Sequence, residues 1–161
     1  MEAFIGVGSN LSGPRERCAE AVGRLRKTRG IRVLACSPWY LTAPVGPPDQ
    51  PDFVNGVVRL ETVLDPSGLL CALKAIEDAM GRAGGPRWGP RVIDLDLLLF
   101  GDLVREEGGL TIPHPEMGRR RFVLAPLCDL APELVHPVLG KTFGEMLKDL
   151  GEGQKVCPLP E

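Results

Sequence analysis

The chain has 161 residues, of which 43% are hydrophobic and 25% charged, and its formal net charge is −2. A chain of this length and composition is typical of a globular protein with one core, so we expect a single domain covering residues 1–161. No apolar run approaches the roughly 20 residues that a membrane span needs, and the amino terminus lacks the features of a secretory signal. We therefore expect a cytoplasmic protein with no membrane partner, and the slight negative charge argues against a protein that coats nucleic acid.

The cysteines and arginines indicate which kinds of site the chain can form. The five cysteines are odd in number and none forms a C-x-x-C pair, so we expect neither a disulfide framework nor a zinc site. The basic residues are unevenly placed, with Arg82, Arg87 and Arg91 in one stretch and three consecutive arginines at 119–121. A locally positive site on a mildly acidic protein suits a small anion better than a polymer.

Strand and helix patterns alternate along the first hundred residues. The predicted elements are a strand at 2–8, a helix from 14 to 30, strands at 31–40 and 53–63, a helix from 66 to 80 and a strand at 92–100. This order predicts an α+β fold with a ferredoxin-like βαββαβ core, in which an antiparallel sheet carries its helices on one face. Beyond residue 101 we expect an irregular C-terminal extension with one helix near 142–150.

The predicted strand at 92–100 carries two carboxylates on one face. Side chains alternate along a strand, so Asp94 and Asp96 point to the same side. The opposite face is apolar and would pack under the helices. By the same alternation it carries Ile93, Leu95, Leu97 and Leu99. Carboxylates this close repel each other unless a cation or an arginine compensates their charge.

Two explanations of the aspartate pair are open. An isolated Asp-x-Asp pair is as often a solvated strand face with arginine partners as it is a metal site. Here the strand is otherwise strongly apolar and directly follows the segment that contains Arg87 and Arg91. Carboxylates with open positions suit Mg²⁺, which keeps waters and takes further ligands from substrate phosphates. Cations beside arginines favour phosphoryl transfer, and a pair of metal ions is compatible with the motif.

The third predicted strand carries a second pair of candidate residues. Phe53 and Asn55 share a face, so an aromatic ring lies beside an amide that both donates and accepts hydrogen bonds. On their own they are better explained as a core aromatic and a polar strand residue. Because Trp88 and Phe122 also fall outside the regular core pattern, we expect a flat heteroaromatic ligand that stacks on rings and is recognised along its edge by Asn55.

Standard nucleotide-binding motifs are missing. Residues 140–142, Gly-Lys-Thr, resemble the end of a phosphate loop, but Val135 stands where that loop requires a glycine. A lone histidine is more often structural than functional, although His114 lies near the arginine run and could contact phosphate. His136 has no evident partner in the sequence, and we expect a structural role for it.

Together these segments resemble the 6-hydroxymethyl-7,8-dihydropterin pyrophosphokinase family of folate biosynthesis. The most specific match is residues 87–96, Arg-Trp-Gly-Pro-Arg-Val-Ile-Asp-Leu-Asp. The resemblance covers nearly the whole chain, because further segments follow the order of the family's motifs, at 8–11, 42–46, 50–55, 112–114 and 120–122.

The resemblance implies a ferredoxin-like enzyme that transfers the β,γ-pyrophosphoryl group of ATP to the pterin hydroxymethyl oxygen and releases AMP. Asp94 and Asp96 would ligate two Mg²⁺ ions and, with Arg82 and Arg91, would form the catalytic set. The ATP site would be lined by Glu77, Arg82, Arg87, Arg91, Leu97, Thr111, His114 and Arg120. The pterin pocket would be formed by Thr42, Pro44, Val45, Phe53, Asn55, Trp88 and Phe122. The partners would be these two small molecules, and we expect a monomer.

The chain departs from the family's pattern in three places. Phe53 stands where tyrosine is common, which keeps the ring and removes a hydroxyl. Gly84 and Gly85 occupy a loop in which a second arginine usually follows Arg82. Pro115 stands where an aromatic residue often follows the histidine.

Two other functions are compatible with parts of the pattern. A ferredoxin-like module that binds single-stranded RNA would need exposed aromatics and a basic sheet, whereas this sheet face carries Asp94 and Asp96 and aromatic content is only 5%. A metal-dependent phosphohydrolase would use the same carboxylates with water as the nucleophile. Product analysis separates the hydrolase from the pyrophosphokinase.

Overall fold

The computed structural model describes residues 1–11, 13–43, 51–81, 92–151 and 153–160. Its elements, in chain order, are β1 (Glu2–Ser9), α1 (Pro14–Arg26), β2 (Ile31–Cys36), β3 (Tyr40–Thr42), β4 (Phe53–Thr62), α2 (Pro66–Ala79), β5 (Asp94–Phe100), β6 (Arg105–Glu107), β7 (Leu110–Ile112), the 3₁₀ helix η1 (Met117–Arg119), α3 (Arg121–Leu130), α4 (Phe143–Leu150) and β8 (Val156–Pro158). The predicted order of strands and helices is confirmed as far as β5 except that one predicted strand is divided in two, and the α+β class is confirmed.

The strand expected at 31–40 is two strands, β2 and β3. Ser37 separates them, because its hydroxyl takes over a position that a backbone carbonyl would fill in a continuous ladder. Its Oγ accepts a hydrogen bond from the Val57 amide at 2.9 Å, while its own amide donates to the Val57 carbonyl at 2.9 Å. Pro38 follows and has no amide hydrogen to continue the ladder.

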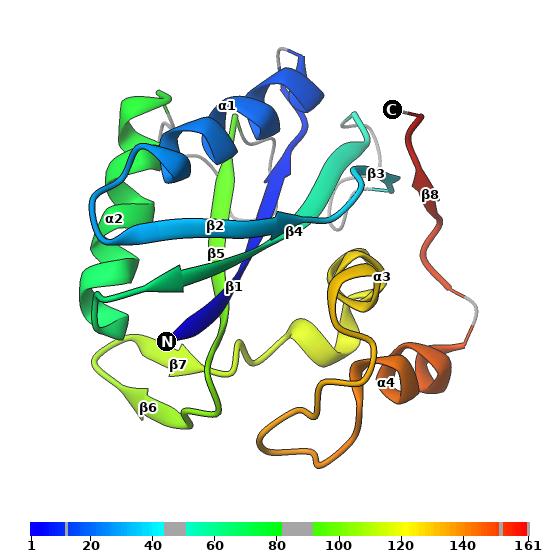
Figure 1. The fold of residues 1–161 in the computed structure, drawn as a ribbon. Helices are drawn as coiled ribbons and strands as arrows, with labels where there is room; N and C mark the ends of the chain where they lie inside the picture. Colours follow the sequence, from blue (N-terminus) through cyan, green and yellow to red (C-terminus); the bar gives the residue numbers. More distant parts are fainter. Residues whose placement is uncertain (12, 44–50, 82–91, 152, 161) are drawn as a thin grey trace.

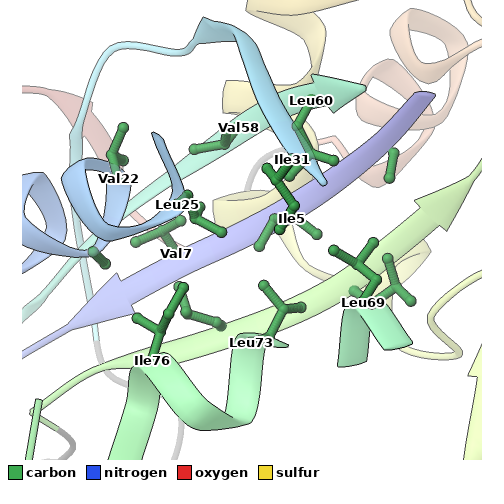
Figure 2. Close-up of a cluster of buried hydrophobic side chains, with 14 of the residues drawn as sticks. Ile5, Val7, Val22, Leu25, Ile31, Val58, Leu60, Leu69, Leu73 and Ile76 are labelled. Carbon is green, nitrogen blue, oxygen red and sulfur yellow. The ribbon is translucent and has the colours of Figure 1, made fainter. Parts of the chain in front are cut away.

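The main sheet is antiparallel, with strand order β5-β1-β4-β3-β8, and β2 also pairs with β4. Helices α1 and α2 lie together on one face of it, as predicted (Figure 1). Ile5 and Val7 of β1 point toward these helices and meet Leu25 of α1 and Leu73 of α2 (Figure 2). Each buried side chain of this size contributes about 1.5–3 kcal/mol, so this layer fixes β1 and β5 firmly.

The C-terminal extension contains more regular structure than predicted. The helix expected near 142–150 is confirmed as α4. A capping box formed by Thr142 and Glu145 stabilises its start. Helix α3, which was not predicted, packs with α4 on the sheet face opposite α1 and α2 (Figure 1). Pro126 lies inside α3, where the loss of an amide donor normally argues against a helix. Among the described residues no helix is both long and apolar enough to cross a membrane.

The predicted alternation along β5 is wrong for Leu99. Between β1 and β5 the pairing shifts, because Phe4 pairs with Leu99 whereas Ile5 pairs with Leu97. Leu98 is therefore an extra residue, and such a β-bulge reverses the alternation beyond it. Leu98 and Leu99 both join the cluster under α3 and α4, while Phe100 turns toward α1 and α2.

The bulge divides the α3 face of the sheet into two halves. One half is apolar, since Phe4, Val57, Leu98 and Leu99 are buried there under α3 and α4. Toward the other end of the same strands this face carries three polar side chains, which belong to Asn55, Asp94 and Asp96. The first turn of α3 lies at the boundary between the halves, where the candidate site is found.

His136 has a structural role, in agreement with the sequence-based expectation, and its partners are now identified. Its ring is buried, and its Nδ1 accepts hydrogen bonds from the amides of Val138 and Leu139, each at 3.1 Å. A protonated imidazole could accept neither bond. Burial lowers the pKa of His136 below its usual value of 6.5.

The protein is expected to lose stability as the pH falls below about 6.5. The fold favours neutral His136, so the unfolded chain takes up a proton first, and the stabilisation is complete only above that pH. Glutamine at this position should reduce the fall in Tm between about pH 7.5 and pH 5.5, as measured by calorimetry. Hydrogen bonds from Arg59 and from Thr142 lower the pKa values of Glu2 and Glu145 below 4.5, so these carboxylates change the stability only at more acidic pH. An equal fall in Tm for His136→Gln and the wild type would contradict this account.

Candidate active site

Three neighbouring strands bring the candidate residues into two rows. Gly8 of β1 pairs with Asn55 of β4 on one side and with Asp94 of β5 on the other. Gly6 pairs in the same way with Asp96. Directly paired residues of antiparallel strands point to the same face, so an amide and two carboxylates share one surface. Two strand spacings, roughly 10 Å, separate Asn55 from Asp94.

A hollow of about 80 Å³ lies above these rows and is closed on one side by the start of α3. It brings together six of the residues predicted from the sequence. Its lining consists of Gly6, Val7, Gly8, Phe53, Asn55, Gly56, Asp94, Asp96, Arg120, Phe122 and Val123. Phe53 approaches from the sheet and Phe122 from the helix, and both rings are half-buried.

The floor of the hollow is open because β1 carries glycine at alternate positions. A Cβ atom on Gly8 would lie 2.4 Å from Asn55 Oδ1, closer than real contacts allow. For a Cβ on Gly6 the three nearest atoms belong to the Leu98 side chain, at 3.6 Å or more. Neither glycine was predicted as a site residue from the sequence. Their spacing, which puts both on one face of a strand, is the signal that would have identified them.

Gly8→Ala is therefore expected to displace the Asn55 amide. We expect about 1–3 kcal/mol of lost stability, as is usual for overpacking, and weaker binding of any ligand that Asn55 recognises. Gly6→Ala is the steric control and should melt close to the wild type, because its methyl group makes an ordinary contact. Denaturant unfolding measures both variants. Equal stability of Gly8→Ala and the wild type would show that Asn55 can move aside at no cost.

The Asn55 amide is held in place from β3. Its Nδ2 donates to Thr42 Oγ1 at 2.7 Å, and both residues are buried. A buried hydrogen bond between two side chains limits the rotamers of each, because either group alone would lack a partner. Thr42 thus orients the amide rather than lining the hollow itself.

Glu77 reaches β5 from the side of α2. Its carboxylate is buried, and its Oε2 accepts a hydrogen bond from the Leu95 amide at 2.8 Å. Leu95 lies between Asp94 and Asp96, and β5 is at the end of the sheet order, so Glu77 satisfies an amide on the outer edge of this strand. The contact fixes the backbone that carries both aspartates.

His114 lies beside β5, next to Leu98, which is two residues beyond Asp96. Its amide donates to the Leu98 carbonyl at 2.9 Å, and its Nδ1 accepts from the Glu116 amide at 3.1 Å. Burial is the main cause that lowers the pKa of His114, Arg120 lowers it further, and the charges of Asp96 and Glu116 act in the opposite direction. A neutral ring whose Nδ1 is an acceptor carries its proton on Nε2, which can donate to an anion.

The family model described as 7,8-dihydro-6-hydroxymethylpterin-pyrophosphokinase (HPPK) matches residues 4–132. The chain belongs to this family. It is 48% identical over 147 residues to the 2-amino-4-hydroxy-6-hydroxymethyldihydropteridine pyrophosphokinase of Pseudomonas aeruginosa, which covers 91% of this chain and 90% of that protein. The protein of the same name from Synechocystis is 43% identical over 148 residues, covering 92% and 75% respectively.

Solved structures support the fold. The wild-type Plasmodium falciparum HPPK-DHPS with pteroate superposes with a TM-score of 0.76 at 18% identity, covering 92% of this chain. The match spans 42% of that longer chain. At this identity the likeness concerns the fold alone, and it agrees with the ferredoxin-like arrangement expected from the sequence.

The remaining residues that the HPPK resemblance implies are distributed as follows. Leu97 points to the α1 and α2 face, so its side chain is outside the hollow. Thr111 belongs to β7 and is half-buried. Arg120 lies over the Phe122 ring, with 5.6 Å between the guanidinium carbon and the ring centroid. Six predicted residues lie outside the described part of the chain, namely Pro44, Val45, Arg82, Arg87, Trp88 and Arg91.

The aspartate pair of this HPPK family member suits a metal ion shared with a substrate. Asp94 is half-buried and Asp96 is exposed, and the two carboxylates lie on one face. The described residues contain no group of three or more His, Cys, Asp or Glu side chains that could hold a metal ion. Two carboxylates without a third protein ligand fit Mg²⁺, which completes its coordination with water and phosphate oxygens, better than a closed structural site.

Proposed function

We propose that this chain transfers the β,γ-pyrophosphoryl group of ATP to the hydroxymethyl group of 6-hydroxymethyl-7,8-dihydropterin, giving AMP and the pterin diphosphate for folate biosynthesis. Membership of the family and 43–48% identity to curated pyrophosphokinases support this activity. The observation that carries it is the row Asn55–Gly8–Asp94. It sets an amide and a carboxylate at opposite ends of one hollow with Gly8 between them, so that the amide would recognise the pterin ring and the carboxylate would hold the metal.

The reaction forms one bond and breaks one. The hydroxymethyl oxygen bonds to the β-phosphorus of ATP, while the bond from that phosphorus to the oxygen bridging to the α-phosphorus breaks. AMP leaves with the bridging oxygen, and the hydroxyl proton is released. Such a transfer depends on in-line positioning and on neutralising phosphate charge more than on covalent chemistry by the protein.

Asp94 and Asp96 would hold Mg²⁺, and we propose that two ions bind. When bound, the metal supplies charge neutralisation for the triphosphate. His114 Nε2 and the Arg120 guanidinium would bind phosphate oxygens, and Glu77 would hold the strand that carries the aspartates. By resemblance, further contacts to ATP come from Arg82, Arg87, Arg91, Leu97 and Thr111, with Arg82 and Arg91 in catalytic roles.

On the other side of the hollow, Asn55 would hydrogen-bond the edge of the pterin, and Phe53 and Phe122 would stack on its faces. Thr42 would hold Asn55 in the required orientation. By resemblance, Pro44, Val45 and Trp88 complete this pocket. A single domain over residues 1–161, a monomeric state and a cytoplasmic location are parts of the same proposal.

An assay with ATP labelled at its β-phosphorus tests the proposed reaction. With Mg²⁺ and the hydroxymethyl pterin present, the label should appear on the pterin while AMP forms in equal amount. Transfer of a single phosphoryl group would leave the label in ADP. A phosphohydrolase would release it as free pyrophosphate without needing the pterin. Either of these outcomes would overturn the proposal.

A further inference from the structure

The C-terminal segment 154–159 lies along the free side of β3. Strand β8 pairs with β3 so that Val156 is opposite Thr42, and the two strands run side by side at one end of the sheet (Figure 1). Bonds on both flanks extend the pairing. The Leu159 amide donates to the Trp39 carbonyl at 2.8 Å, and the Ala43 amide donates to the carbonyl of Lys155 at 3.4 Å.

Gln154 adds a side-chain contact at the end of β3. Its Nε2 donates to the Ala43 carbonyl at 2.6 Å. Both backbone groups of Ala43 are therefore bound by the C-terminal segment, the amide through Lys155 and the carbonyl through Gln154. Leu159 anchors the segment by packing against the core cluster that lies under α1 and α2.

Strand β3 is the element through which this segment reaches the hollow. It has only three residues, and a strand this short is held mainly by its neighbours. On one side it pairs with β4, with Tyr40 opposite Asn55 and Thr42 opposite Phe53. On the other side its neighbour is β8. Thr42 Oγ1 accepts the bond that orients the Asn55 amide, so a displaced β3 would release that amide.

We propose that residues 154–159 are a positioning element for the pterin side of the site. By fixing β3 from outside, they keep Thr42 at hydrogen-bond distance from Asn55. The family model ends at residue 132, so this segment lies beyond the part of the chain that defines the family. The inference rests on the proposed function only in naming the pterin as the ligand of Asn55.

Loss of the segment should act on one substrate and leave the other unaffected. If the correct Asn55 orientation becomes a minor population, the apparent affinity for the pterin falls in proportion to that population. ATP should bind as before, because Asp94 and Asp96 are on β5, which β1 and β4 separate from β3. A general loss of folding would instead weaken both substrates together.

Two variants test the inference. One is a chain shortened to end at Gly153, and the other is the full chain with Gln154→Ala. Lys148→Ala, on the exposed side of α4, is the control. The shortened chain should raise KM and the calorimetric Kd for the pterin by about tenfold, the effect of a tenfold smaller competent population. Gln154→Ala should move both in the same direction by less. KM for ATP should stay within about twofold of the wild type, and Lys148→Ala should match the wild type in every measurement.

Unchanged pterin KM and Kd in both variants would overturn the inference, as would an equal rise for pterin and ATP. If the shortened chain melts below the assay temperature, Gln154→Ala gives the decision, because it removes one side chain and keeps the strand pairing. Failure of the proposed function is a separate result. It would appear as an absence of labelled pterin product in the wild type, and direct pterin binding by the variants would still test the positioning role.

Discussion

Asp96→Asn is expected to slow pyrophosphoryl transfer by about a thousandfold, since losing a metal ligand removes several kcal/mol of transition-state stabilisation and each 1.4 kcal/mol is tenfold in rate. Asparagine keeps the shape of the side chain and removes only its charge. The side chain is exposed at the rim of the hollow, so the substitution buries no unpaired polar group. Asp94 lies roughly 7 Å away on the same strand face. The substitution therefore removes the electrostatic repulsion between the two carboxylates.

The same substitution should therefore leave Tm equal to that of the wild type or slightly higher. Asp102→Asn is the matched control, because Asp102 is an exposed aspartate just beyond the end of β5 and outside the hollow. Its turnover should be unchanged. Single-turnover rates and calorimetry measure the two effects. A variant that melts much lower but still turns over would show that the carboxylate pair stabilises the fold and does not serve catalysis.

Asn55→Ala is expected to weaken pterin binding by about a hundredfold, because a site built to hydrogen-bond its ligand loses affinity strongly when one partner is missing. KM for ATP should change little, since the aspartates lie two strands away. The substitution also leaves the buried Thr42 hydroxyl without its bond from Nδ2, so about 1–3 kcal/mol of stability should be lost.

A control for that loss of stability lies on the same strand. Thr62, at the far end of β4, is buried and bonds the Gly30 carbonyl and the Leu64 amide through its hydroxyl. Thr62→Val should cost a similar amount of stability and leave pterin KM unchanged. Calorimetric titration with the pterin compares the variants. If both lose pterin affinity to the same degree, the effect reflects stability and not recognition by Asn55.

Local patterns predicted the part of the fold that depends on neighbouring residues. Alternation along 92–100 placed Asp94 and Asp96 on one face, and it is regular as far as Leu97. The helix predicted from residue 66 begins there as α2, and the Asp65 side chain caps it by accepting the Gly68 amide at 2.7 Å. These signals act over two to four residues, so they can be recognised without knowing the tertiary structure.

Features that depend on strand pairing could not be predicted in the same way. The bulge at Leu98 follows from the register between β1 and β5, which alternation within β5 does not reveal. Helix α3 was missed because Pro126 argues against a helix locally, whereas Leu124 and Leu127 bury enough surface against the sheet to stabilise it. The role of Gly8 likewise appears only when Asn55 is known to be its partner.

Binding of Mn²⁺, a paramagnetic substitute for Mg²⁺, would show directly whether the aspartate pair holds a metal on the nucleotide. Electron paramagnetic resonance would measure bound Mn²⁺ in the complex with a non-hydrolysable ATP analogue, for the wild type and for Asp94→Asn combined with Asp96→Asn. We expect tight Mn²⁺ binding that needs both the analogue and the two carboxylates. Equal Mn²⁺ affinity in the doubly substituted protein, with its fold intact, would contradict it.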